Sequence, residues 1–287
     1  MAQQDTDVFV QLERFYDTLP RSDARAEEFG GLVLFVREGS GWPFYARPRP
    51  RAETPSAADV TAVRHRQRTL GLPEAFEWVH ENAPDLLAVA RSAGLDVLLA
   101  PLMVLEPAAL IPDLPVAGGA IRLLDAADPG YTADLASSRA VAQLAFGAPT
   151  GSAVTNGALV AEPAGPRERD LVPPPDDDLI QASRKKAADG RFATAVVRSS
   201  SEGILATGVY QRVRDVAEVA GVATLPYARR RGYASQLTAT LARHALQEGA
   251  HLVFLSAGDD DAARLYSRVG FRRIGTACIA EPASAVL

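Results

Sequence analysis

The sequence is poor in the residues that form disulfides and metal sites. It has 287 residues but a single cysteine, Cys278, which excludes an internal disulfide and fits a reducing compartment. Its four histidines show no ligand spacing with cysteine or carboxylates, so no metal is predicted. No run approaches the roughly 18 uncharged apolar residues of a membrane helix, and the N-terminal residues lack the basic region of a signal peptide. We therefore predict a cytoplasmic protein that does not bind a membrane.

Net positive charge is lacking too. The formal net charge is −5 at pH 7, so nucleic acid is not the expected partner. Arginines cluster at residues 47–51 and 64–68, where a solvated helix face or loop is favoured over a local basic patch. The sequence also has no Gly-Lys-Ser/Thr phosphate loop, no dinucleotide fingerprint after a strand and no Gly-x-Ser-x-Gly elbow. Hydrophobic residues make up 47% of the chain, which predicts a globular protein with a core of ordinary size.

Helical and strand-like patterns alternate along the chain and predict a mixed α/β fold. In the first half they predict helices or strands at residues 8–16, 32–36, 44–46, 56–70, 76–79, 85–93 and 97–105. In the second half they predict them at residues 121–124, 131–146, 176–188, 192–198, 204–212, 218–225, 251–256, 259–269 and 271–279. Residues 106–119 hold three prolines and two glycines without periodicity, which indicates a linker between domains 1–117 and 118–287. A Gly/Pro/Ser/Ala stretch reaching Pro175 is predicted to be a mobile loop or a lid.

One stretch, Glu218–Ser235, combines a strand, a basic turn and the start of a helix. The strand of small and β-branched residues reaches Pro226, and three arginines and Gly232 follow it. The first turn of the next helix has N–H groups without intrahelical partners, and its dipole end is positive. A Cβ at Gly232 would block the close approach of a phosphate and restrict the turn. These features predict an anion site into which a pyrophosphate would fit.

The spacing Arg229-x-x-Gly232-x-Ala234 resembles the acetyl-CoA motif, Gln/Arg-x-x-Gly-x-Gly/Ala, of the GNAT superfamily of N-acetyltransferases. A second segment, from Asp259 to Phe271, is similar to that family's signature Asn-x-x-Ala-x-x-Leu-Tyr-x-x-x-Gly-Phe. The two signatures stand in the order that the family has. The resemblance implies that residues 118–287 form an acyl-CoA N-acyltransferase (GNAT) fold with acetyl-CoA as co-substrate and no metal.

The first half repeats part of this pattern. Residues 76–105 show a strand, a helix and a strand, as residues 251–279 do, and the ends of the two helices can be aligned. Ala90 then stands where Tyr266 stands, and residues 47–55 have no Arg-x-x-Gly-x-Ala turn. We predict that residues 1–117 are a smaller α/β domain and a degenerate copy of the same fold without its own cofactor. The alternative is an unrelated accessory α/β domain.

The resemblance implies which residues contact acetyl-CoA. Backbone groups of the strand before the motif would bind the pantetheine arm, at an unpaired edge for which Gly221 is a plausible bulge residue. Backbone amides of the motif would hold the pyrophosphate. Asp259 replaces a family asparagine and cannot donate a hydrogen bond as asparagine does, so an N-cap role for Asp259 is equally favoured. The predicted cofactor-binding residues are Val222, Ala223, Thr224, Arg229, Arg230, Arg231, Gly232, Tyr233, Ala234, Ser235 and Asp259.

Two residues are predicted to be catalytic. Tyr266 falls on the family tyrosine that protonates the cofactor sulfur, although it could be only a core aromatic. Glu218 lies where one branch of the family carries a glutamate base, and a carboxylate there could deprotonate an ammonium. If no bulge intervenes, Glu218 also shares a strand face with Val222 and Thr224. The alternative is a salt-bridged or solvated strand residue.

The resemblance implies that the protein is an N-acetyltransferase. The acetyl group would pass to a primary amine of a small molecule or peptide by direct attack in a ternary complex. Cys278, in the last strand, is predicted to be a small buried hydrophobe, which argues against an acyl-cysteine intermediate. The alternative is a non-catalytic acyl-CoA-binding sensor or protein-interaction module. The protein is expected to be a monomer or a homodimer.

Overall fold

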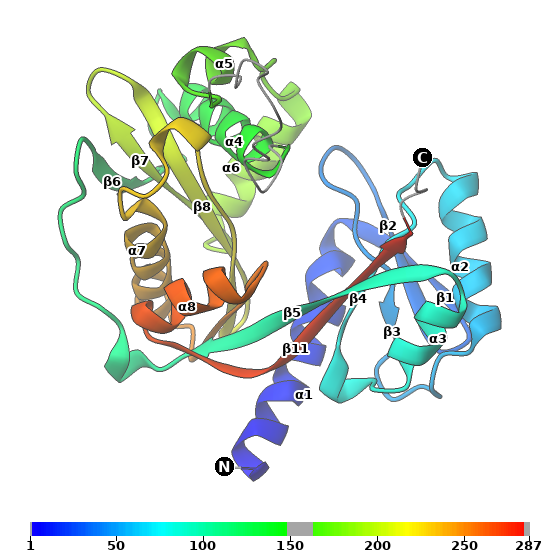
Figure 1. Cartoon of the computed structure of the whole chain (residues 1–287). Coiled ribbons are helices and arrows are strands. Elements are labelled where there is room, and N and C mark those ends of the chain that lie inside the picture. The colour runs from blue at the N-terminus through cyan, green and yellow to red at the C-terminus, as the bar shows by residue number, and fades with distance from the viewer. Residues whose placement is uncertain (1, 148–162, 284–287) are drawn as a thin grey trace, which may run out of the picture. The chain divides into compact units, whose positions relative to one another are not determined.

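Helices and strands both occur in each half of the chain in the computed structural model, which describes residues 2–147 and 163–283 (Figure 1). The α-helices are α1 (Ala2–Thr18), α2 (Ala57–Thr69), α3 (Leu86–Ser92), α4 (Tyr131–Gly147), α5 (Pro166–Leu171), α6 (Asp177–Ala188), α7 (Tyr233–Gln247) and α8 (Asp260–Val269). The strands are β1 (Ala24–Phe29), β2 (Leu32–Arg37), β3 (Arg47–Pro48), β4 (Phe76–Val79), β5 (Leu95–Leu105), β6 (Ala120–Leu123), β7 (Phe192–Ser199), β8 (Gly203–Val213), β9 (Val216–Thr224), β10 (Leu252–Ser256) and β11 (Phe271–Pro282). Among the described residues, no helix is long and apolar enough to cross a membrane.

The strands form two sheets. A small sheet has the order β1-β2-β3, and a large one has the order β4-β11-β5-β10-β9-β8-β7-β6. The large sheet is mixed, because β9 pairs with β8 antiparallel and with β10 parallel. The predicted mixed α/β class is thereby confirmed.

The described chain divides into two compact units. Unit 1 comprises the residues up to Val104 together with Leu255–Arg264 and the residues from Arg272 onward. Unit 2 comprises Leu105–Phe254 and Leu265–Phe271. The end of the chain therefore belongs to the unit that contains its beginning. The predicted division into domains 1–117 and 118–287 stays a prediction.

The last strand completes the core of unit 1. Strand β11 lies beside β4 (Figure 1) and pairs with it antiparallel. In this pairing Cys278 lies opposite Trp78. One face of this pair packs against α2, α3 and β2 in an apolar cluster. Its buried members are Leu32, Leu34, Val36, Ala46, Val60, Val63, Phe76, Trp78, Leu86, Ala90, Leu95, Cys278 and Ala280. The prediction of a small buried hydrophobe at Cys278 is confirmed.

In unit 2, helices α4 and α7 pack on β8 from opposite faces. The hydroxyls of Ser138 on α4 and Thr207 on β8 lie 2.7 Å apart in a buried hydrogen bond. The next residue, Gly208, faces α7, because a Cβ placed there would lie 3.0 Å from a methyl carbon of Leu241. Successive residues of a strand point to opposite faces. Because Gly208 has no side chain, α7 can approach the sheet closely.

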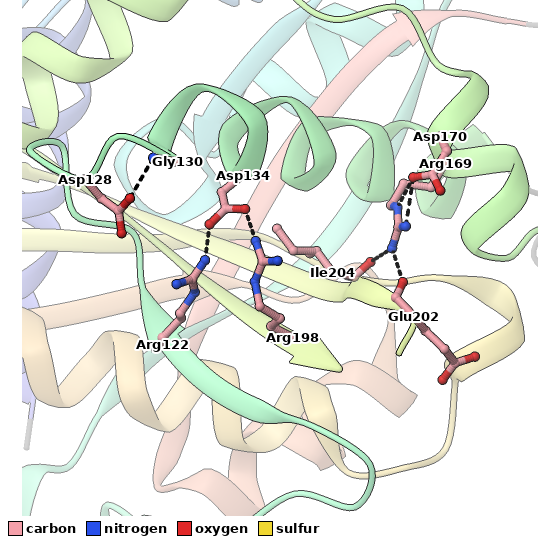
Figure 2. Close-up of polar contacts among 9 residues, drawn as sticks. All are labelled: Arg122, Asp128, Gly130, Asp134, Arg169, Asp170, Arg198, Glu202 and Ile204. Carbon is pink, nitrogen blue, oxygen red and sulfur yellow. Dashed lines mark hydrogen bonds and ion pairs between the residues drawn. The ribbon is translucent and has the colours of Figure 1, made fainter. Parts of the chain in front are cut away.

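Helix α4 is tied to two strands by one carboxylate. Asp134 is buried near the start of α4 and forms ion pairs with Arg122 on β6 and Arg198 on β7 (Figure 2). Two guanidinium groups compensate the desolvation of this carboxylate, which alone would be costly. The Asp134 cluster therefore fixes the N-terminal part of α4 against the sheet.

Several parts of the chain differ from the sequence-based predictions. The strand predicted at residues 44–46 lies one step later, as β3 at Arg47–Pro48. Strand β1 was not predicted, although it forms a hairpin with β2 around Gly30. The predicted linker is irregular but held in place, because Ile111 donates its N–H to the Val269 carbonyl at 3.2 Å and Leu114 donates to Gln236 Oε1 at 3.0 Å. The predicted loop or lid before Pro175 contains α5, and its residues 148–162 lie outside the described residues.

Candidate acetyl-CoA site

Strand β9 contains a bulge at the predicted position. Thr207 of β8 pairs with Ala223, and Val209 pairs with Ala220. One residue of β8 therefore opposes two of β9, Gly221 and Val222. Gly221 has a φ of 59°, a left-handed conformation that glycine adopts without steric cost. The predicted bulge at Gly221 is confirmed.

The bulge also changes the face on which the strand residues lie. An extra residue reverses the alternation of side chains along a strand. The condition under which Glu218 would share a strand face with Val222 and Thr224 is therefore not met. That condition was a strand without a bulge.

The pairing of β9 with β10 covers only the first part of β9. It runs from Val216, opposite Leu252, to Glu218, opposite Phe254. After Glu218, β9 continues to pair with β8 on one side. On its other side, the described pairing with β10 has ended. This arrangement leaves a strand edge at Val222–Thr224 that an extended ligand could use.

The turn after β9 leads into α7 through two left-handed residues. Arg230 has a φ of 66° and Gly232 a φ of 79°, and Gly232 is the N-cap of α7. Among the described residues, no side chain caps this helix end, and a Cβ at Gly232 would meet no atom within 4 Å other than those of its chain neighbours. The first-turn amides of this 15-residue helix have no intrahelical partner and stand at the positive end of its dipole. This geometry fits a phosphate group.

The side chains of the turn have distinct contacts. Arg229 donates from Nη2 to the Ala145 carbonyl near the end of α4 at 3.1 Å. The guanidinium carbon of Arg231 lies 5.0 Å from the centre of the Tyr227 ring, and hydrogen bonds with Tyr233 and Tyr227 raise the pKa of Arg231. Tyr233 is buried and donates its hydroxyl to the Ala117 carbonyl at 2.6 Å. Only the backbone of Tyr233 is therefore available to a ligand.

Helix α5, which was not predicted, begins beside this turn. Tyr227 donates its N–H to the Ala164 carbonyl at 3.1 Å, just before α5. The buried Arg169 of α5 donates to the carbonyls of Glu202 at 2.7 Å and Ile204 at 2.6 Å (Figure 2). The signals for α5 are Pro166 at its first position and Glu168, whose Oε2 accepts the Gly165 N–H at 2.8 Å.

The predicted catalytic residues lie on β9 and α8. Glu218 is 9% exposed, and Gln211 on β8 donates a hydrogen bond to its Oε2 at 3.0 Å. Tyr266 is partly exposed on α8, with its ring centre 6.3 Å from that of Phe271 in an edge-to-face arrangement. Asp259 precedes α8, and its Oδ1 accepts the Ala262 N–H at 2.7 Å. Asp259 thus caps the helix, and its contact with a cofactor stays a prediction.

Known proteins share this architecture. Residues 192–280 match the model of the FR47-like protein family. A GCN5-related N-acetyltransferase from Kribbella flavida is similar in structure, with a TM-score of 0.64 and 23% identity over 96% of each chain. The chain has the GNAT fold. The resemblance stated from the two signatures is thereby confirmed.

Two further similar structures have lower identity. A GCN5-related N-acetyltransferase from Sphaerobacter thermophilus has a TM-score of 0.52 and 18% identity, covering 90% of this chain and 82% of its own. A tandem GNAT protein from the clavulanic acid biosynthesis pathway has a TM-score of 0.50 and 13% identity, covering 88% of this chain and 79% of its own. Among curated proteins, none matches the sequence.

The element order explains the likeness to a tandem protein. The sequence β1-β2-β3-α2-β4-α3-β5 in the first half repeats as β7-β8-β9-α7-β10-α8-β11 in the second. Gly94 after α3 and Gly270 after α8 both have positive φ, at 79° and 118°. The two halves of the chain therefore have the same order of elements, and α2 is the counterpart of α7.

The counterpart helix in unit 1 does not offer the same amides. Ser56 caps α2, and the Asp59 side chain accepts the Ser56 N–H at 2.9 Å and the Gly31 N–H at 3.2 Å. A carboxylate thus already occupies the N-terminus of α2. Ala90 is buried in the core where the second half has Tyr266. Unit 1 accordingly lacks the features that make α7 suitable for a phosphate.

The described part of the chain has neither a reactive thiol nor a group of metal ligands. Cys278 is fully buried, and burial raises the pKa of its thiol to about 12. The reactive thiolate is therefore scarce near neutral pH. Within residues 2–147 and 163–283, no group of three or more His, Cys, Asp or Glu side chains could hold a metal ion.

Proposed function

We propose that this protein is an acetyl-CoA-dependent N-acetyltransferase that acts on a primary amine by direct attack in a ternary complex. The observation that carries the proposal is the bulge at Gly221 of β9, followed along the chain by the α7 amides after Gly232, which no described side chain caps. A GNAT fold alone would not specify a ligand. A strand edge followed by a turn with unpaired amides at a positive helix end supports a ligand that has an extended arm and a pyrophosphate.

Binding of acetyl-CoA would use mainly the backbone. The edge at Val222–Thr224 would hydrogen-bond the pantetheine amides, and the amides of Arg230–Ser235 would hold the pyrophosphate. Arg229 would position the turn through Ala145. The thioester would carry the acetyl group. Glu218 on β9 and Tyr266 on α8 would catalyse its transfer.

Two side chains would move protons during the transfer. The Glu218 carboxylate would take a proton from the ammonium form of the acceptor, so that the neutral nitrogen attacks the thioester carbon. A C–N bond forms as the C–S bond breaks. The Tyr266 hydroxyl would give its proton to the departing sulfur and recover one from solvent, while the attacking nitrogen loses its second proton to solvent. A small-molecule or peptide amine, a monomeric or homodimeric state and a cytoplasmic location stay predictions.

Calorimetric titration with acetyl-CoA tests the site directly. We expect one site per chain, because Asp59 occupies the α2 end in unit 1. Gly232→Glu should abolish binding by placing a carboxylate beside the α7 amides. Gly249→Glu is the matched control, because Gly249 also has a positive φ of 91° and no neighbour within 4 Å. Both variants incur a similar backbone cost of about 1 kcal/mol.

The outcomes separate the competing interpretations. Loss of binding in Gly232→Glu alone would support the site, and release of free thiol with a panel of amines would then establish transfer. Two sites per chain would contradict the degenerate first copy. Binding without thiol release would favour a non-catalytic acyl-CoA sensor. No binding to the unaltered protein at millimolar ligand would refute the proposed function.

A further inference from the structure

Arg230 adopts a backbone conformation that its residue type disfavours. Its φ of 66° is left-handed, a region that glycine occupies without cost and that arginine rarely adopts. Such outliers persist where surrounding structure enforces them, and they cluster at ligand-binding sites. Glycine would relieve the strain here at once. Arg51 and Arg214 also have left-handed φ values, of 61° and 55°, so the backbone conformation alone does not mark a ligand site. Arg230 differs from them in its place, two residues before Gly232 at the start of α7.

The three arginines of the turn differ in what they contact. Arg229 bonds to the Ala145 carbonyl, and Arg231 interacts with Tyr227 and Tyr233. Arg230 is exposed, and within the described residues its guanidinium has no hydrogen bond, ion pair or ring contact. Its charge stands two residues before Gly232, beside the amides that would hold a pyrophosphate. Of the three guanidinium groups, that of Arg230 is the one left for a ligand.

We propose that the Arg230 guanidinium binds the 3′-phosphate of CoA and selects the phosphorylated nucleotide over dephospho-CoA. This inference rests on the proposed function, since it concerns the same ligand. The backbone amides behind Gly232 suit the pyrophosphate. A phosphate monoester carries up to two negative charges and three acceptor oxygens, and a guanidinium matches that geometry with paired hydrogen bonds. The left-handed backbone at Arg230 is then the cost of directing this side chain to the ligand.

The test compares the dissociation constants of CoA and dephospho-CoA by calorimetry. The unaltered protein should bind CoA about 10-fold more tightly, the size of one charge-assisted interaction. Arg230→Gln should remove this preference and change the affinity for dephospho-CoA by less than about twofold. Arg229→Gln should weaken both ligands equally, because Arg229 acts through Ala145.

A backbone control separates strain from ligand binding. Arg230→Gly should also remove the preference and raise Tm by about 2 °C, because glycine relieves the left-handed strain. Arg214→Gly should raise Tm similarly, since Arg214 has a φ of 55° in the turn between β8 and β9, and should keep the preference.

Several results would overturn the inference. A preference that persists in Arg230→Gln would do so, as would equal binding of the two nucleotides by the unaltered protein. Equal weakening of both nucleotides in Arg230→Gln would assign the guanidinium to the pyrophosphate instead. Binding of neither nucleotide would refute the proposed function itself, and this inference with it.

Discussion

Replacing Ala280 by aspartate is expected to destabilise unit 1 strongly, although residue 280 lies near the end of the chain. Ala280 is 0% exposed and lies opposite Phe76 in the pairing of β11 with β4. A carboxylate there would be buried among apolar side chains without a partner. The expected loss is about 3 kcal/mol or more of the free energy of unfolding, which is a large part of the roughly 5–15 kcal/mol that stabilises a domain.

Tryptophan fluorescence can measure this effect in unit 1 alone. The chain has two tryptophans, and both Trp42 and Trp78 belong to unit 1. Trp78 is buried opposite Cys278, so its emission should shift to the red in Ala280→Asp at low denaturant. Glu281→Gln is the control, because the neighbouring Glu281 is exposed. An unchanged transition in Ala280→Asp would mean that β11 does not complete the core of unit 1.

The sequence predicted well those features that depend on neighbouring residues. The strand, turn and helix from Glu218 to Ser235 lie within one local segment, and Gly221 marked the bulge because glycine in a strand favours one. Helix α4 was also predicted, since its apolar residues recur at helical spacing over 17 residues. The short α5 was missed, because six residues give too little periodicity and a helix of that length depends on tertiary contacts.

Features that depend on distant contacts could not be predicted. The pattern of β11 indicates a strand but does not say that β4 is its neighbour, nearly 200 residues earlier in the chain. The motif in the sequence marks Arg229, but it does not say what the side chains of the three arginines contact, and those contacts follow from the fold. Likewise, the bulge that the sequence indicated at Gly221 invalidated the strand-face argument for Glu218. That conflict was resolved only by the register of β8 and β9.

Removing the hydroxyl of Tyr266 is expected to lower kcat for acetyl transfer by about 10²-fold or more, as the loss of a general acid does. Tyr266→Phe keeps the ring that packs edge-to-face on Phe271, so Tm should stay within about 2 °C of the unaltered protein. The affinity for acetyl-CoA should also be unchanged, because the predicted contacts to the ligand are made by the backbone of β9 and α7. The measurement pairs steady-state thiol release with calorimetry, so that kcat and binding are determined separately.

Tyr210→Phe is the control for losing a phenol elsewhere in unit 2. Tyr210 is buried on β8, and its hydroxyl lies 3.0 Å from Nδ1 of His244 on α7. Removing that hydrogen bond should cost about 1 kcal/mol of stability and leave kcat unchanged. The two variants should thus show opposite effects, with activity lost in one and stability lost in the other. If Tyr266→Phe kept its full kcat, Tyr266 would be a core aromatic of α8, and another group would have to protonate the departing sulfur.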